Sequence, residues 1–214
     1  MIKLENKNRL LISYGFEPKV MLPELLKEAN FLSELPSSGL IVIKPNLVLA
    51  KNSSSGATTD PQVVASIISF LKINGFHDIA IMESSWLGDC TDRAFRICGY
   101  EEISKTLNVP LVNLKKDQTK KVASGSFTFN ICKKVLDSAY LINVPVLKAH
   151  CQTRLTCALK NLKGCIPDSE KRRFHDFGLH EPIARLNSAI KSRLIVVDAI
   201  IGDLTFEEGG TPVQ

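Results

Sequence analysis

The sequence predicts an α/β protein in which a mainly parallel sheet lies between helices on both faces. Short apolar runs rich in β-branched residues alternate with amphipathic segments, as parallel strands joined by crossover helices require. Two runs, Leu40–Ile43 and Leu194–Val197, are apolar at every position, which is typical of strands covered on both faces. We expect one layered αβα domain over residues 1–214.

Six segments are predicted to be strands because they are short, apolar and bounded by turn residues. They are Leu10–Gly15, Leu40–Pro45, Asp78–Ser84, Pro110–Leu114, Ala139–Val146 and Leu194–Ile200. The segment Lys120–Val135 interrupts the alternation of strands and helices, and its pattern predicts a β-hairpin at the edge of the sheet.

The clearest helix is predicted within Asp60–Phe76. Its apolar residues fall on one stripe, Thr59 or Asp60 suits the N-cap, Pro61 the first turn and Gly75 the C-terminal end. Further helices are expected at Leu22–Leu32, Thr91–Cys98, Glu101–Leu107, Arg154–Lys163 and Glu181–Ser192. In the fourth of these, Thr153, Thr156, Lys160 and Lys163 would share the exposed face. Leu155, Ala158, Leu159 and Leu162 would form its buried stripe.

The composition favours a cytoplasmic location without a membrane span. The N-terminal MIKLENKNRL lacks the apolar core of a signal peptide, and no apolar run approaches the roughly 18–20 residues that a span needs. The six cysteines form no C-x-x-C pair and are expected to be reduced thiols. The glycine-rich Gly202–Gln214 follows a predicted strand without a closing element, so we expect a truncated domain, the fragment of a longer protein.

The charge is unevenly distributed. The net charge is +5, but the segment from Lys115 to Arg173 holds 13 Lys or Arg against 4 Asp or Glu. Such a segment favours an anionic partner. Nucleic acid is the less favoured partner, because few aromatic residues are interleaved and no recognition module is present.

The stretch Val144–Pro167 concentrates residues that can carry chemistry. Its cysteines, Cys151, Cys157 and Cys165, are spaced C-x₅-C-x₇-C, which does not fit the short spacing of structural zinc sites. A Cys–His nucleophile is no better supported, because adjacent residues rarely face each other. An anion-binding site is favoured, since Lys148 and His150 are expected to follow a strand and Thr153 to begin a helix.

Several blocks of this sequence resemble the domain of unknown function 362 family. They are VIKPNL (Val42–Leu47), GATTDPQVV (Gly56–Val64), Val144–Pro167, FHDFGLHEPIARL (Phe174–Leu186) and LIVVDAIIG (Leu194–Gly202). The resemblance implies that a shared function would be carried by Lys148, His150, Thr153, Thr156, Lys160, Asn161, Lys163 and Gly164. Longer members often carry a ferredoxin-type iron–sulfur module, whose cysteine run is absent here, and no reaction is established for the family.

We therefore expect an enzyme, or a cofactor-handling protein, that acts on a small carboxylated or phosphorylated molecule. Lys148 and Lys160 would neutralise its charge and His150 would be the acid or base. The other candidate ligand-binding residues are Lys44, Asn46, Thr58, Thr59, Thr153, Thr156 and Asn161. No resident metal or cofactor is assigned, although Asp198 and Asp203 are candidates for a divalent ion. The alternative is an electron-transfer module whose basic face, formed by Lys171, Arg172 and Arg173, docks an acidic ferredoxin.

Overall fold

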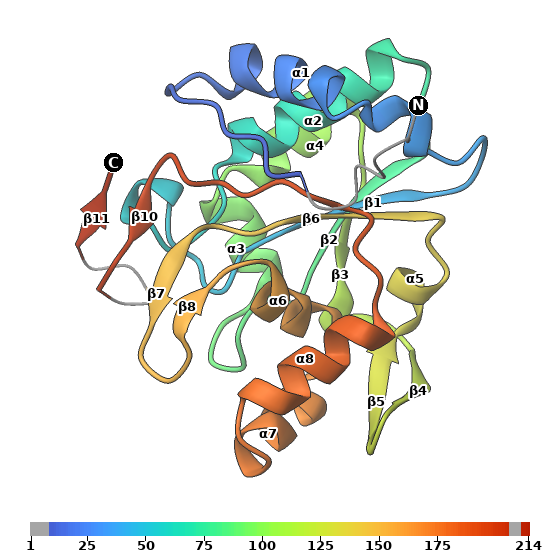
Figure 1. Ribbon diagram of the computed structural model, residues 1–214, viewed down its shortest axis with the longest axis vertical. Helices are drawn as coiled ribbons and strands as arrows, with labels where there is room; N and C mark the ends of the chain where they lie inside the picture. The colour runs from blue at the N-terminus through green and yellow to red at the C-terminus, as the bar shows by residue number, and fades with distance from the viewer. Residues whose placement is uncertain (1–8, 206–210) are drawn as a thin grey trace, which may run out of the picture.

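The computed structural model describes residues 9–205 and 211–214. Five strands form a parallel sheet in the order β3-β2-β1-β6-β9 (Figure 1). Their bounds are Ile41–Pro45 for β1, Ile79–Glu83 for β2, Leu111–Asn113 for β3, Tyr140–Val144 for β6 and Leu194–Ile195 for β9. Helices flank the sheet on both faces, so the predicted α/β class is confirmed.

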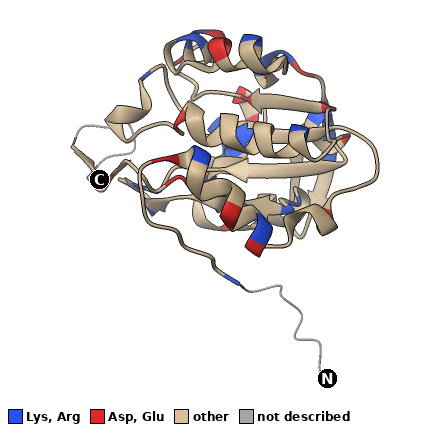
Figure 2. Cartoon of the chain, turned by 90° about the horizontal axis from the view of Figure 1, so that it is seen from above, with Lys and Arg blue, Asp and Glu red and all other residues tan. Residues whose placement is uncertain are grey.

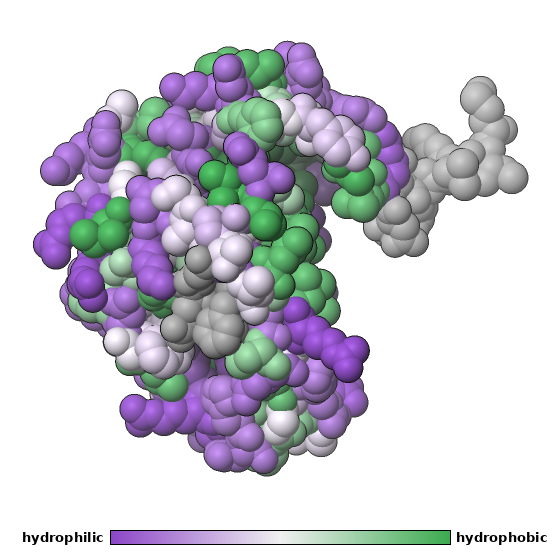
Figure 3. Space-filling model, turned by 90° about the vertical axis from the view of Figure 1, so that its left-hand side faces the viewer, coloured by the Kyte–Doolittle hydropathy of each residue, from purple (hydrophilic) through white to green (hydrophobic). Residues whose placement is uncertain are grey.

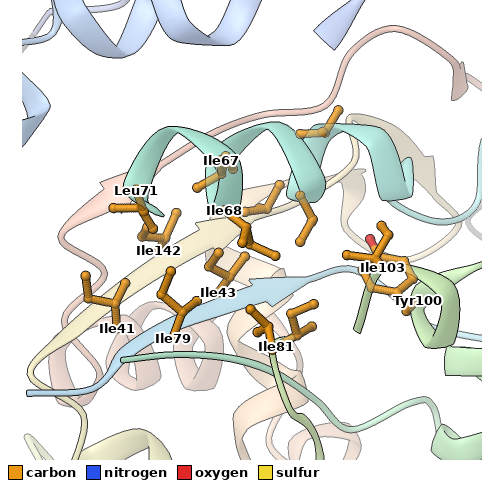
Figure 4. Packing of buried hydrophobic residues seen from close by; sticks show 14 of the residues in the cluster. Ile41, Ile43, Ile67, Ile68, Leu71, Ile79, Ile81, Tyr100, Ile103 and Ile142 are labelled. Atoms are coloured by element: carbon orange, nitrogen blue, oxygen red, sulfur yellow. The ribbon is translucent and has the colours of Figure 1, made fainter. Parts of the chain in front are cut away.

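One face is covered by α1 (Pro18–Glu28), α2 (Pro61–Ile73) and α4 (Tyr100–Leu107), with α3 (Thr91–Ile97) beside them. The α2 stripe predicted from the sequence packs on the isoleucines of β1, β2 and β6 (Figure 4). The Asp60 carboxylate accepts a hydrogen bond from the Gln62 amide at 2.7 Å, which caps α2 as expected. The turn η1 (Phe31–Glu34) follows α1, and η2 (Ser53–Ser55) precedes α2.

The opposite face is covered by elements from the second half of the chain. These are η3 (Leu114–Lys116), the hairpin β4 (Thr119–Ser124) and β5 (Phe127–Cys132), α5 (Lys133–Leu136), α6 (Ala158–Asn161), η4 (Leu162–Cys165), α7 (Asp168–Asp176) and α8 (His180–Ala189). Val42, Ala80 and Met82 of the strands form a core with Leu162 and Phe174 from this layer. The predicted hairpin is thus confirmed, but it forms a two-stranded sheet of its own rather than the edge of the five-stranded sheet. The predicted burial of the strands on both faces is confirmed for β1 and β2.

Two predicted strands are wrong in extent. Leu10–Gly15 forms no strand, and Leu10, Ile12 and Tyr14 are 80%, 64% and 91% exposed, because no edge of the sheet pairs with this segment. The predicted Leu194–Ile200 pairs with β6 only at Leu194 and Ile195, and afterwards through a single bridge between Val146 and Asp198. The apolar run at Leu194–Ile200 therefore indicated a segment beside the sheet but did not determine how many of its residues pair with β6.

The predicted helix Arg154–Lys163 is also wrong at its start. Antiparallel strands β7 (Lys148–His150) and β8 (Arg154–Thr156) form a hairpin, and the helix begins only at Ala158. Arg154 has a left-handed φ of 63°, which breaks a helical path. Leu155 and Leu159 of the expected buried stripe are 56% and 58% exposed. Conversely, residues 168–176, where no helix was predicted, form the nine-residue α7.

The final short strands, β10 (Gly202–Asp203) and β11 (Pro212–Val213), pair with each other. Gly209 and Gly210 of the expected C-terminal loop, together with Phe206, Glu207 and Glu208, lie outside the described residues. Seen from above, basic and acidic residues are interspersed (Figure 2). The face in Figure 3 mixes hydrophilic and hydrophobic residues. Within residues 9–205 and 211–214, no helix has the length and apolar character to cross a membrane.

Candidate functional site

A cleft of about 100 Å³ lies at the carboxyl ends of β1 and β2, where open α/β sheets commonly bind ligands. It is lined by residues from both strands, from β7, β8, α6 and η4, and from α7. They are Lys44, Asn46, Val48, Glu83, Ser84, Ser85, Trp86, Leu87, Lys148, Thr156, Lys160, Asn161, Lys163, Gly164, Lys171 and His175. Five lysines and one carboxylate thus stand among the described lining residues.

The floor of the cleft is a buried ion pair between Lys44 and Glu83. Lys44 Nζ donates to Glu83 Oε2 at 2.7 Å, to Asn161 Oδ1 at 3.0 Å and to the Pro45 carbonyl at 2.7 Å. These three contacts match the three donors of an ammonium group. That Lys44 binds ligand stays a prediction, and its contacts among the described residues hold the floor together. Asn161 extends this network to β6, because its Nδ2 donates to Asn143 Oδ1 at 2.7 Å.

Glu83 is held just as firmly. Its Oε2 also accepts the Leu47 amide at 3.0 Å, and its Oε1 accepts the Ser84 amide at 2.7 Å. Hydrogen bonds of this kind offset the cost of burying a carboxylate. The pair therefore fixes where the β1 and β2 loops leave the sheet.

Gly164 allows η4 to pass directly over this pair. A Cβ atom at Gly164 would lie 2.0 Å from Glu83 Oε1 and 2.8 Å from Lys44 Nζ. Any larger residue would have to displace a buried charge, so glycine is required here for close approach rather than for a left-handed backbone. The segment Lys160–Gly164 is thereby pressed against the carboxyl end of the sheet.

Lys171 of α7 closes one side of the cleft. Its Nζ donates to the Ser84 hydroxyl, to the Ser85 carbonyl at 2.7 Å and to Asp168 Oδ1 at 3.1 Å, and the residue is buried. Burial lowers the pKa of Lys171 below its ordinary value, although Asp168 opposes the shift. Sequence reasoning had assigned Lys171 to an exposed basic surface. The Asp168–Lys171 spacing of three residues, typical of a helical ion pair, was the signal for its true partner.

The remaining lysines have different surroundings. Lys148 is buried, and its ammonium donates to the Ala57 carbonyl. Lys163 Nζ lies 5.1 Å from the centre of the Phe174 ring. Burial, with the nearby charges of Lys160 and Lys171, lowers the pKa of Lys163 to about 8.

Thr156 presents a buried hydroxyl to the cleft. The residue is 2% exposed, and its Oγ1 has no hydrogen-bond partner in the part of the chain that the structure describes. A buried polar group without a partner costs roughly 1–3 kcal/mol. Thr156 lines the same cavity as the lysines, so a bound molecule with an acceptor oxygen would satisfy the hydroxyl.

His175 is the histidine that the structure brings into the cleft. Burial, then the charges of Lys163 and Lys160, lower its pKa below the ordinary value. Its imidazole is therefore neutral near pH 7 and able to accept a proton. In the sequence, His175 lies in the block Phe174–Leu186 but was not among the predicted site residues.

His150, Thr153, Thr58 and Thr59 lie outside the described lining of the cleft. His150 Nδ1 accepts the Gln152 and Thr153 amides at 3.0 and 3.1 Å, which shapes the turn between β7 and β8. The Thr59 hydroxyl donates to the Val144 carbonyl, and that of Thr58 donates to the Lys51 carbonyl. Four of the ten predicted site residues thus support loops, while the other six lie together at the cleft.

Thr153 borders a second hollow of about 290 Å³ between the β8–α6 segment and α8. Its lining is largely apolar and includes Leu155, Leu159 and Ile183, while Lys160 borders both hollows. The predicted start of an anion-binding helix at Thr153 is wrong, because this residue lies in the hairpin turn.

The carboxylates of Asp198 and Asp203 serve the backbone. Asp198 accepts the Asp60 and Ile200 amides at 2.8 and 3.2 Å, and Asp203 accepts the Thr205 and Thr211 amides at 2.7 and 2.9 Å. Among the described residues, no three His, Cys, Asp or Glu side chains gather in a metal-binding group. Burial raises the pKa of Asp198 to about 6.

Comparison with known proteins identifies the group to which the chain is related. A family model described as domain of unknown function (DUF362) matches residues 41–214. A thylakoid-associated protein of Synechocystis sp. is 28% identical over 185 residues, which cover 81% of this chain and 54% of that protein. The chain thus spans about half the length of this relative. The matched region contains all the described residues of the cleft, and the chain belongs to the DUF362 family.

Proposed function

We propose that the cleft binds a small carboxylated or phosphorylated molecule, as one step of an enzymatic reaction. The unsatisfied hydroxyl of Thr156 is the observation that carries the proposal, because it is buried beside an excess of cationic groups. A lysine side chain that is in contact with water does not need a bound anion to balance its charge. A polar group sealed in a lysine-lined cavity is stabilised when a ligand oxygen takes the missing hydrogen bond.

The charges in the cleft support the same conclusion. Glu83 neutralises Lys44, and Asp168 neutralises Lys171. Lys163 adds a further positive charge to the same cavity, beside Lys160 and Lys171. Like charges in a partly buried site repel, and a bound anion relieves this repulsion. Lys148 and Lys160 are thus proposed to neutralise the ligand, with hydrogen bonds from Thr156, Asn46 and Asn161.

Two histidines are candidates for moving a proton in the reaction. The role predicted for His150 stays a prediction, and its Nδ1 is engaged in the hairpin turn. His175 has the better position, since it lines the cleft with Lys160 and Lys163. A general acid or base must reach the reacting group, so we favour His175.

Thermal unfolding with inorganic phosphate and citrate, against chloride at matched ionic strength, tests the binding. A ligand at 100 times its dissociation constant stabilises a protein by about 2.7 kcal/mol. We expect both anions to raise the melting temperature of the wild type. Lys160→Ala and Thr156→Val should reduce the rise, whereas Lys121→Ala on the exposed β4 should leave it unchanged. Equal stabilisation of all four proteins would exclude binding in this cleft.

The alternative, docking of an acidic ferredoxin on a basic face, has less support. Lys171, one of the three residues expected to form that face, is buried against Ser84 and Ser85. Arg172 and Arg173 are exposed, but Arg173 pairs with Glu170 at 2.7 Å. The cytoplasmic location expected from the sequence stays a prediction.

A further inference from the structure

We propose that Lys163 is a nucleophilic amine, which forms an imine with the carbonyl carbon of a small oxo acid held in the cleft. This inference rests on the anion-binding function proposed above and names the substrate class of the same site. Its first support is the contrast between Lys163 and the other lysines of the cleft.

Three of these lysines have oxygen acceptors. Lys44 and Lys171 donate to carboxylates at 2.7 and 3.1 Å, and Lys148 donates to a backbone carbonyl. Lys163 makes no hydrogen bond or ion pair with any described residue, and its Nζ faces the Phe174 ring at 5.1 Å. The ring face attracts the Lys163 ammonium and holds it in place without supplying an oxygen acceptor. The Lys163 amine is therefore held in place but has no hydrogen-bond or ion-pair partner among the described residues.

The surroundings of Lys163 favour the neutral, reactive form of the amine. Burial is the main cause of its lowered pKa, followed by repulsion from Lys160 and Lys171, and the resulting value is about 8. At pH 7.5 the neutral fraction is then on the order of a hundredfold larger than for an ordinary lysine. Desolvation and a neighbouring cation are the two established means of activating a lysine nucleophile.

The same cavity contains groups that would hold the acid part of the substrate. Lys160 and the Thr156 hydroxyl line it with Lys163. A volume of about 100 Å³ suits a molecule of a few heavy atoms, in which the carbonyl group lies close to a carboxylate or phosphate. Anchoring the anion would bring the carbonyl carbon to the amine and turn a bimolecular encounter into a local one.

The chemical step balances without an oxidant or a metal. The lone pair of Nζ attacks the carbonyl carbon, and proton transfer from nitrogen to oxygen gives a carbinolamine. Loss of its hydroxyl group as water leaves a C=N bond between Lys163 and the substrate. His175 lines the cleft and has a lowered pKa, caused by burial and then by Lys163 and Lys160. Its neutral imidazole would take the proton from nitrogen and return it to the departing hydroxyl.

Reductive trapping with glyoxylate and sodium cyanoborohydride tests the inference on the full chain. Hydride transfer to the imine carbon would convert Lys163 to a carboxymethyl-lysine, which peptide mass spectrometry locates. At pH 7.5 we expect Lys163 to be labelled at least tenfold faster than the exposed Lys121, with a rate that rises through a midpoint near pH 8. Lys163→Arg and Lys163→Met should each remove this label, while Lys134→Arg on the exposed side of α5 should retain it.

Experiments with inorganic phosphate distinguish failure of the imine proposal from failure of the anion-binding function on which it rests. Phosphate should raise the melting temperature and slow the labelling of Lys163, because both would occupy one cleft. If phosphate stabilises the protein but Lys163 is labelled no faster than Lys121, the imine is refuted and anion binding stands. If Lys163 is labelled rapidly without stabilisation or protection by phosphate, the anion-binding function is refuted, and with it the oxo acid as substrate class.

Discussion

Lys44 Nζ and Glu83 Oε2 lie 2.7 Å apart beneath the cleft, and their side chains are only 1% and 3% exposed. Each charge is buried with the other as its partner, and the chain around them supplies further hydrogen bonds. In such an arrangement, losing one partner costs more than losing both.

The first prediction concerns this pair. Lys44→Met should lower the free energy of unfolding by about 3–5 kcal/mol, because it leaves Glu83 buried without its counter-ion. Lys44→Met with Glu83→Gln should recover part of that loss. Urea unfolding measures both, and Glu181→Ala, which removes the exposed pair with Arg185, provides the control with a change of about 0–1 kcal/mol. If Lys44→Met lowered the free energy of unfolding no more than Glu181→Ala does, the Lys44–Glu83 pair would have to be accessible to water.

Gly164→Ala should destabilise the protein by more than backbone conformation explains. The added Cβ would lie 2.0 Å from Glu83 Oε1. Gly75→Ala is the comparison, since Gly75 has a left-handed φ of 88° but open space around its Cα. It should cost about 1–2 kcal/mol for the strained backbone alone. If the two substitutions cost the same in urea unfolding, η4 does not press on the ion pair.

Thr156→Val and Thr59→Val should change stability in opposite directions. Both threonines are buried, but the Thr156 hydroxyl has no described partner, whereas the Thr59 hydroxyl donates to Val144 and accepts the Asn46 amide. We expect Thr156→Val to be neutral or stabilising by up to about 1 kcal/mol, and Thr59→Val to cost about 1–3 kcal/mol. Differential scanning calorimetry without added anions gives the comparison. A large loss in Thr156→Val would reveal a hydrogen bond to ordered water.

Asp198 should make stability depend on pH between about 4 and 6. Its pKa is raised by burial from 3.8 to about 6 in the folded state, so the folded protein binds its proton more tightly than the unfolded chain. This contribution is present below pH 4 and is lost as the pH rises to 6. The wild type should thus lose roughly 1–3 kcal/mol over that window relative to Asp198→Asn. Parallel curves of unfolding free energy against pH would contradict the prediction.

Lys163→Met should stabilise the protein at pH 7 and lose this advantage in alkali. The folded-state pKa of Lys163 is about 8 and its ordinary value is 10.5, so protonation favours the unfolded chain. The wild type should therefore gain stability relative to the variant as the pH rises from 8 to 10.5. The expected difference at pH 7 is about 1–2 kcal/mol, after allowance for partial exposure. A variant that is less stable at pH 7 would show that the Phe174 contact outweighs the burial of charge.

The layers of the fold were predictable because local patterns determine them. Continuous apolar runs gave β1, β2 and β6, and one apolar stripe with an N-cap gave α2. The Leu10–Gly15 strand failed because pairing depends on which sheet edge is free, and residues far away in the sequence decide that. The hairpin of β7 and β8 was missed because its turn is stabilised by the His150 side chain, without the glycine or asparagine that usually marks such a turn.

The candidate site was predictable in location but not in its internal contacts. Thr156 and Lys160 were expected on one face of a helix and Lys148 after the strand before it, and the structure brings all three to one cleft through a hairpin and a later helix. Thr58 and Thr59 looked equally suited to a ligand, but their hydroxyls hold loops. A sequence shows which side chains can bind an anion, while only the folded chain shows which ones already have a partner.

The hydrogen-bond network of Lys44, Glu83 and Asn161 also affects the order in which parts of the chain fold during synthesis. Lys44 and Asn161 are 117 residues apart in the sequence, and Glu83 lies between them. At about 5–20 residues per second, the ribosome would expose both charges several seconds before Asn161 and Gly164 emerge to cover them. Until then, β1 and β2 can pair but their carboxyl ends remain hydrated. Closure of this end of the sheet is therefore a late event, and slowed translation after Glu83 should prolong the life of a half-formed domain.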